Sequence, residues 1–336
     1  MLSRYRSLII LTLAAYTVAS SGDRSAEFQN CVIRCSVDTC VSSSMLPLAL
    51  QLTRWNCADD CKYTCMHVVT NKAVELGLPI EQYYGKWPFW RFMGMQEPAS
   101  VAFSLLNLWF HAAGFSKIRR SVPNGHIMKT YYLLWAIISM NTWVWSSIFH
   151  TRDLPTTEKL DYFSAALAIG YSLYYTVIRL FHLYPRRNTL ANTSLDPKRT
   201  TRWIWSLFCV IIYVSHVSYL TMSPRFDYSY NIAFNLALGL THNAIWSLYS
   251  LPSSFPVLWR FLSKPKSYRP AFAGKAAFFV LLTTAATALE LFDFPPWGRF
   301  IDAHALWHLS TAPIIPFWYD FLVEDSLDDG WRGAKV

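Results

Sequence analysis

The sequence of 336 residues predicts an all-α integral membrane protein: a bundle of seven transmembrane helices preceded by a small, disulfide-rich N-terminal domain. Two observations predict this class. Hydrophobic residues make up 53% of the chain and charged residues only 15%, whereas soluble domains are about 25% charged. Mostly apolar stretches also recur at lengths of roughly 20 residues, which is the length a helix needs to cross a bilayer core.

The first 20 residues are expected to form a cleavable secretory signal peptide. Arg4 and Arg6 precede an apolar run over residues 8–15, and small residues follow at 18–20. This order is typical of signal peptides, and the apolar run is too short to span a membrane. The mature chain is therefore expected to begin in the lumen of the secretory pathway.

Six clustered cysteines follow in the segment 21–98, which we expect to fold as a lumenal domain. In an oxidising compartment such a cluster predicts about three disulfides, whose pairing the sequence does not fix. A zinc site built from the same cysteines is the alternative. Cys209 stands apart in an apolar stretch and is expected to be a small buried hydrophobe. The clustered residues are Cys31, Cys35, Cys40, Cys57, Cys61 and Cys65.

A seven-helix domain is expected over residues 99–323, with a cytosolic tail over 324–336. Basic residues gather in the first, third and fifth loops between the spans. Because Lys and Arg in short loops mark the cytosolic side, their positions agree with a lumenal start. The net charge of +9 therefore reflects membrane topology, and no nucleic-acid partner is expected. The predicted spans are 99–116, 131–149, 160–183, 203–222, 229–250, 271–292 and 303–323.

Polar side chains fall at the predicted lumenal ends of several spans. Ser146 and His150 are four residues apart, as are His304 and His308, so each pair shares one face of a helix. Asp161 opens the span that follows His150. Ionisable groups at membrane depth cost several kcal/mol unless they pair, line water or bind an ion. Their common depth therefore predicts a metal site.

The three imidazoles match the ligand set of a catalytic zinc ion, which takes three protein ligands and a water. We expect His150, His304 and His308 to bind Zn²⁺, although three imidazoles also suit other divalent ions. Zinc would lower the pKa of the bound water from about 15.7 to about 7. Asp161 is expected to transfer the proton or to orient a ligand histidine. Ser146 is expected to stabilise the oxyanion.

Each of these residues also has a structural interpretation. A lone histidine in an apolar span is more often a packing residue, Asp161 could complement a helix dipole, and Ser146 could bond within its own helix. Because all these residues fall at the same predicted depth, a metal site is favoured over the structural interpretations. His216, inside the fourth span, is a weaker candidate for substrate contact. Glu290 and Asp293 are expected at the membrane interface, without a catalytic role.

The set Ser146-x-x-x-His150, Asp161 and His304-x-x-x-His308 resembles the CREST superfamily of seven-span metal hydrolases, which includes alkaline ceramidases. Longer motifs over nearly the whole mature chain are similar to its Per1-like branch, the phospholipases that remodel GPI anchors after their attachment to proteins. The motifs lie at Asp59–Cys65, Gly85–Phe89, Gln96–Ser100, Asn141–Asp153, Glu158–Phe163, His216–Leu220, Arg225–Tyr228, Asp293–Pro296 and Asp302–His308.

The resemblance implies hydrolysis of the sn-2 acyl ester in the phosphatidylinositol of GPI-anchored proteins. These proteins and membrane lipids would be the partners. It implies residence in the endoplasmic reticulum membrane, or alternatively the Golgi membrane, with the active site lumenal. A ceramidase-type amidase acting on sphingolipids and a non-catalytic lipid receptor or chaperone for GPI-anchored proteins stay open. The residues fix neither the acyl-chain preference nor the oligomeric state.

Overall fold

The computed structural model describes residues 20–41, 45–185 and 198–334. The regular elements in these ranges are all helices, accompanied by three isolated β-bridges. The predicted signal peptide, residues 1–20, lies outside the described part apart from its last residue. The chain divides into two compact units. Unit 1 comprises residues 1–99, 150–152 and 293–303, and unit 2 comprises residues 100–149, 153–292 and 304–336.

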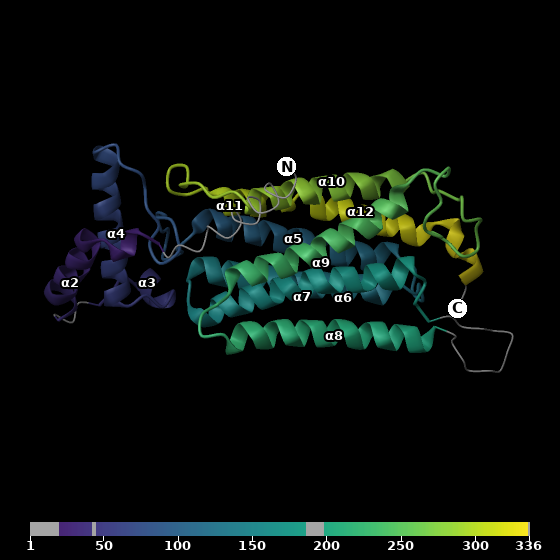
Figure 1. The fold of residues 1–336 in the computed structure, drawn as a ribbon, viewed down its shortest axis with the longest axis horizontal. Coiled ribbons are helices and arrows are strands. Elements are labelled where there is room, and N and C mark those ends of the chain that lie inside the picture. Colours follow the sequence, from purple (N-terminus) through teal and green to yellow (C-terminus); the bar gives the residue numbers. More distant parts are fainter. Residues whose placement is uncertain (1–19, 42–44, 186–197, 335–336) are drawn as a thin grey trace, which may run out of the picture. The chain divides into compact units, whose positions relative to one another are not determined.

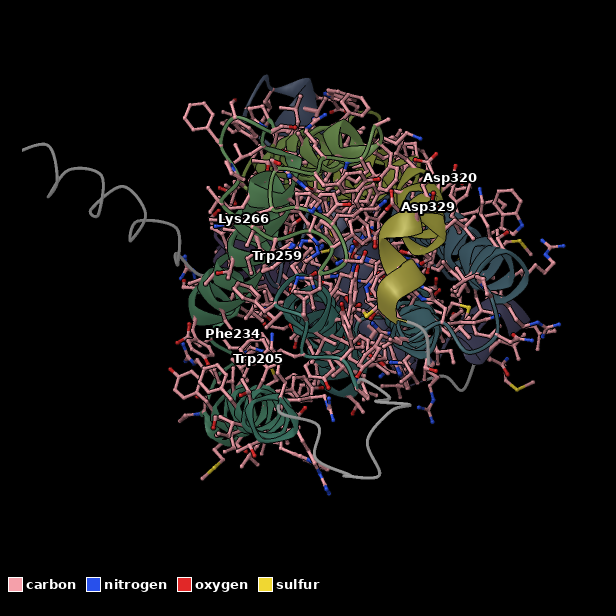
Figure 2. The ribbon with its side chains drawn as sticks, turned by 90° about the vertical axis from the view of Figure 1, so that its right-hand side faces the viewer. Trp205, Phe234, Trp259, Lys266, Asp320 and Asp329 are labelled. Carbon is pink, nitrogen blue, oxygen red and sulfur yellow. A yellow bond between two sulfur atoms is a disulfide. The ribbon has the colours of Figure 1, made fainter. Side chains whose placement is uncertain are left out.

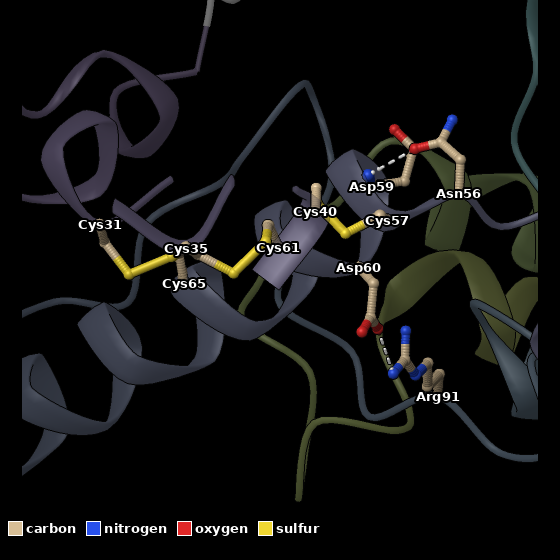
Figure 3. Close-up of a disulfide and its surroundings, with 10 residues drawn as sticks. All are labelled: Cys31, Cys35, Cys40, Asn56, Cys57, Asp59, Asp60, Cys61, Cys65 and Arg91. Atoms are coloured by element: carbon tan, nitrogen blue, oxygen red, sulfur yellow. Dashed lines mark hydrogen bonds and ion pairs between the residues drawn. A yellow bond between two sulfur atoms is a disulfide. The ribbon is translucent and has the colours of Figure 1, made fainter. Parts of the chain in front are cut away.

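Unit 1 is built on two helices that three disulfides join. Helix α2 (Ala26–Cys40) and helix α4 (Cys57–Glu75) each carry three cysteines, and these face one another (Figure 3). Three disulfides were predicted, and they are confirmed. The cysteines are oxidised and offer no thiolate to a zinc ion. The pairs are Cys31–Cys65, Cys35–Cys61 and Cys40–Cys57.

The short helices η1 (Gly22–Arg24) and α3 (Leu48–Leu52) complete the described helices of the head, by which we mean residues 20–97 of unit 1. Asn56 caps α4, since its side chain accepts a hydrogen bond from the Asp59 N–H at 2.8 Å. Phe28, Cys65 and Tyr83 form a small buried core under the disulfides.

Long helices occupy the first six predicted spans, and Figure 1 shows them running alongside one another. The seventh predicted span is wrong as a single helix. It is divided into α11 and α12 at Pro313, which lacks an N–H and disfavours helical backbone in the residue before it. The elements are α5 (Pro98–Ser121), α6 (Lys129–Thr151), α7 (Pro155–Leu180), α8 (Arg199–Met222), α9 (Tyr228–Ser250), α10 (Ala273–Glu290), α11 (Ala303–Thr311) and α12 (Ile314–Leu327).

Three of these helices, α7, α8 and α10, are long and apolar enough to cross a membrane. Helices α11 and α12 are too short to do so alone. Helix α5 carries buried polar residues such as Asn107 and His111, which lower its mean hydropathy. The described residues thus contain three candidate membrane spans. The seven-span bundle stays a prediction.

The segment predicted as a tail begins inside α12 and continues into the 3₁₀ helix η2 (Asp329–Ala334). Figure 2 looks onto this end of unit 2, with Asp329 labelled on the yellow ribbon. Asp325 is fully buried. Its carboxylate accepts two hydrogen bonds from Arg179 of α7, both at 2.8 Å, and one from Tyr249 at 2.9 Å. This network joins α12 to α7 and α9.

Candidate metal centre

One face of α6 carries three residues of the candidate site. Trp143, Ser146 and His150 recur at helical spacing, so their side chains project on the same side. Ser146 is buried, and its hydroxyl lies 3.0 Å from that of Ser104 on α5. The Trp143 ring lies 5.2 Å from the ring of His308 between centroids. This face of α6 therefore meets α11 at His308.

Helix α11 brings its two histidines together. The Nε2 atoms of His304 and His308 lie 3.0 Å apart. The Nδ1 atom of His304 lies 2.8 Å from a carboxylate oxygen of Glu290, at the end of α10. Asn107 of α5 donates a hydrogen bond to the His308 carbonyl at 2.8 Å, and this contact fixes the register of α11 against α5.

His150 lies at the end of α6 and belongs to unit 1. Its Nδ1 atom lies 2.8 Å from Oε2 of Glu97, and both side chains are buried. The other carboxylate oxygen of Glu97 pairs with the Lys86 ammonium. Burial alone would raise the pKa of the Glu97 carboxyl, but Lys86 and His150 hold that pKa well below its usual range.

The carboxylates of Glu97 and Glu290 favour the same tautomer in His150 and His304. A carboxylate beside Nδ1 favours the tautomer with its proton there, which leaves the Nε2 lone pair for a metal. The 3.0 Å separation of the His304 and His308 Nε2 atoms is close to the roughly 3.3 Å that two imidazole ligands take around tetrahedral zinc. His304 and His308 of unit 2 thus bring two ligand nitrogens together, and His150 of unit 1 is the candidate third ligand. The residues therefore fit the predicted zinc.

The two remaining residues that the sequence analysis proposed for the site, Asp161 and His216, lie on α7 and α8. Asp161 is partly buried, two turns into α7, and its backbone carbonyl accepts a hydrogen bond from the Ser164 hydroxyl at 2.9 Å. His216 of α8 is fully buried. Its ring stacks on Phe234 of α9 at 3.9 Å between centroids, and Figure 2 labels Phe234. Neither ring nitrogen of His216 has a hydrogen-bond partner among the described residues.

Sequence reasoning missed four residues that support the histidines. Glu97 appeared only within a motif, and Glu290 was expected at the interface without a role. Ser104 and Asn107 belong to a polar stripe on α5 that recurs at helical spacing and is buried along its length. This helical spacing of polar residues is the sequence feature that could have predicted them, because a polar face on an apolar helix indicates contact with other polar groups.

These features define an all-helical protein with candidate membrane spans, a disulfide-bonded N-terminal unit and a histidine group suited to a divalent metal. The model of the Per1-like family matches residues 47–326. The chain belongs to the Per1-like family, which confirms the resemblance drawn from its motifs.

Curated relatives match over nearly their whole length. The chain is 39% identical over 328 residues to the "Protein PER1 homolog" of Schizosaccharomyces pombe, covering 96% of this chain and 92% of the relative. It is 38% identical to the "Post-GPI attachment to proteins factor 3" of Drosophila melanogaster, covering 95% and 94%. It is 34% identical to the human "GPI-specific phospholipase A2-like PGAP3", covering 96% and 94%. No solved structure matches the chain.

Proposed function

We propose that this chain is a GPI-specific phospholipase A2, which hydrolyses the sn-2 acyl ester of the phosphatidylinositol in GPI-anchored proteins. The relatives named as GPI-specific phospholipase A2-like support the substrate and the bond. One structural observation carries the chemistry. His150 and His304 each have Nδ1 within 2.8 Å of a glutamate oxygen, which is the arrangement that directs Nε2 toward a metal.

His150, His304 and His308 would hold the ion, and three imidazoles with one water form a known type of catalytic zinc site. When bound, zinc supplies Lewis acidity and lowers the pKa of water to about 7. The helical spacing on α6 supports the participation of His150. It follows Trp143 by two turns on one face, and Trp143 contacts His308.

The chain's own side chains supply the remaining roles. Ser146, one turn before His150, has its hydroxyl fixed by Ser104 at 3.0 Å. We assign it to hydrogen-bond the ester carbonyl and the oxyanion that the carbonyl becomes. Asp161 accepts the proton that hydrolysis releases and returns it to the leaving alcohol. His216 offers two ring nitrogens to polar groups of the lipid.

The three candidate membrane helices and the names of the relatives support a membrane protein of the secretory pathway. We place it in the endoplasmic reticulum, with the Golgi as the alternative, and we place the histidines on the lumenal side. Ester carbonyls of diacylglycerolipids lie between headgroups and hydrocarbon. A site at the ends of α6 and α10 matches that depth if these helices span the bilayer.

Release of fatty acid from a GPI-anchored protein by the purified chain tests the proposal. The His304→Ala variant should lose release while it stays abundant and correctly located. His242→Ala is the control, because His242 also lies on a helix of unit 2 but has no assigned role; it should keep its activity. Full release by the His304→Ala variant would contradict the proposal.

The same assay separates the two rival functions. An amidase of ceramidase type would release fatty acid from ceramide and leave the GPI-anchored substrate intact. A receptor or chaperone would bind the GPI-anchored protein without releasing fatty acid from either substrate.

A further inference from the structure

Glu97 holds His150 through both its main chain and its side chain. The Glu97 N–H donates to the His150 carbonyl oxygen at 3.0 Å, and its Oε2 atom lies 2.8 Å from His150 Nδ1. These two contacts fix the backbone and the ring of the same histidine. The ring therefore has little freedom to turn its Nε2 atom away from the direction that the carboxylate sets.

The other oxygen of Glu97 is held by Lys86, which belongs to the head. Lys86 lies in a tight turn whose ends are joined by two backbone hydrogen bonds with Tyr83, at 2.7 and 3.0 Å. Tyr83 packs on Phe28, with ring centroids 5.0 Å apart, in the buried core beside Cys65. An unbroken series of contacts thus runs from the disulfide-bonded core to the ring of His150.

The residues after His150 are held by the same unit. The Gln96 N–H donates to the Thr151 carbonyl at 3.0 Å. The Arg152 guanidinium donates to an Asp59 carboxylate oxygen at 2.6 Å, and it lies 4.4 Å from the ring centroid of Trp55. Contacts within unit 1 therefore hold three successive residues, the last two of α6 and the one that follows it.

We propose that Glu97 is a positioning residue for the metal, and that the head, through Lys86, is needed for full metal affinity. The head then helps to hold one metal ligand, His150, in its orientation. This inference rests on the proposed metal centre. Removal of the group that orients a ligand histidine typically weakens metal binding by about 10–100-fold.

The test is the zinc dissociation constant of the purified full-length chain, measured by competition with a chromophoric chelator. Glu97→Gln should weaken zinc binding by about tenfold or more, because the amide cannot replace the negative charge beside Nδ1. Lys86→Met should weaken it in the same direction but less. Lys72→Met is the matched control. Lys72 also pairs with a glutamate of the head, Glu27, at 2.7 Å, but that pair is exposed; its loss should leave the zinc affinity unchanged.

Glu97 is buried, so Glu97→Gln leaves the Lys86 ammonium without its carboxylate and can impair folding. The double variant Lys86→Met/Glu97→Gln removes both charges and keeps the inference testable. A folded single or double variant with the zinc affinity of the unmodified chain would overturn the inference, and so would an equal loss in the Lys72→Met control. If the unmodified chain binds no zinc or other divalent cation, the proposed metal centre itself fails.

Discussion

Asn107 donates its side-chain amide to the carbonyl oxygen of His308 at 2.8 Å, and also to the Phe103 carbonyl at 2.8 Å. The hydroxyl of Thr311 donates to the Asn107 side-chain oxygen at 3.2 Å. Asn107, a fully buried residue of α5, therefore makes hydrogen bonds with the C-terminal end of α11. Helix α11 carries two of the three histidines. The position of His308 depends on a contact between residues 201 positions apart in the sequence.

Asn107→Leu should lower both stability and activity. The substitution removes the Asn107 amide from the His308 carbonyl, which keeps the Thr311 hydroxyl as a donor at 2.9 Å. Each lost hydrogen bond costs about 1 kcal/mol, and the loss frees α11 to shift. Thermal unfolding and fatty-acid release measure the two effects. Asn243→Leu is the control, because Asn243 bonds Thr283 at 3.1 Å away from the histidines. It should lower stability alone; equal activity in the two variants would contradict the assigned role.

Much of the fold could be predicted from the sequence, because its signals are local. Runs of apolar residues place the first six helices, and the spacing of cysteines places the disulfide-bonded unit. The break at Pro313 was also readable, since proline interrupts a helix, but the apolar run around it suggested one span. The histidine pairs follow from helical periodicity alone.

The supporting residues could not be predicted in the same way. Glu97 meets His150 across 53 positions, and Glu290 meets His304 across a chain turn between α10 and α11. Such contacts depend on how elements pack, which periodicity does not determine. The pairing of the six cysteines is another example: the order of the disulfides follows from the antiparallel approach of α2 and α4.

Arg179→Met should destabilise unit 2 by about 3–5 kcal/mol, because it leaves the buried Asp325 carboxylate without its bidentate partner. The double variant Arg179→Met/Asp325→Leu should recover most of that loss, since neither charge then remains buried. Chemical denaturation of the two variants measures the difference. A double variant no more stable than Arg179→Met would show that the two charges are not coupled.

His67 should make the head less stable at acidic pH. Burial, together with a smaller effect of the nearby Arg299 cation, lowers the pKa of His67 to about 4. Arg299 donates to Nδ1 at 3.1 Å, and Nε2 lies 3.1 Å from the Phe89 carbonyl, so the neutral ring satisfies both contacts. An unfolded His67 titrates near pH 6.5.

Between pH 6.5 and about 4 the unfolded chain therefore binds a proton that the folded head does not. The free energy of unfolding should fall as pH falls through this window, by up to about 1.4 kcal/mol per unit. Denaturation of the full chain across this range measures the slope. His67→Gln, which keeps one donor and one acceptor, should remove this contribution; an unchanged slope would contradict the assignment.

His216→Phe should raise the KM for a GPI-anchored substrate with a smaller effect on kcat. The ring stacks on Phe234 at 3.9 Å, and phenylalanine preserves that packing while it removes both ring nitrogens. Thermal stability should stay level or rise, because an unpartnered buried polar group is lost. A fall in kcat at constant KM would instead assign His216 to the chemical step.

The metal content of the purified chain tests the central claim most directly. Elemental analysis of the unmodified protein should find about one zinc per chain, as expected for a three-histidine catalytic site. His150→Ala, His304→Ala and His308→Ala should each lose that metal, whereas the control His242→Ala should retain it. A chain without bound divalent metal, or full metal retention by the three histidine variants, would contradict the account.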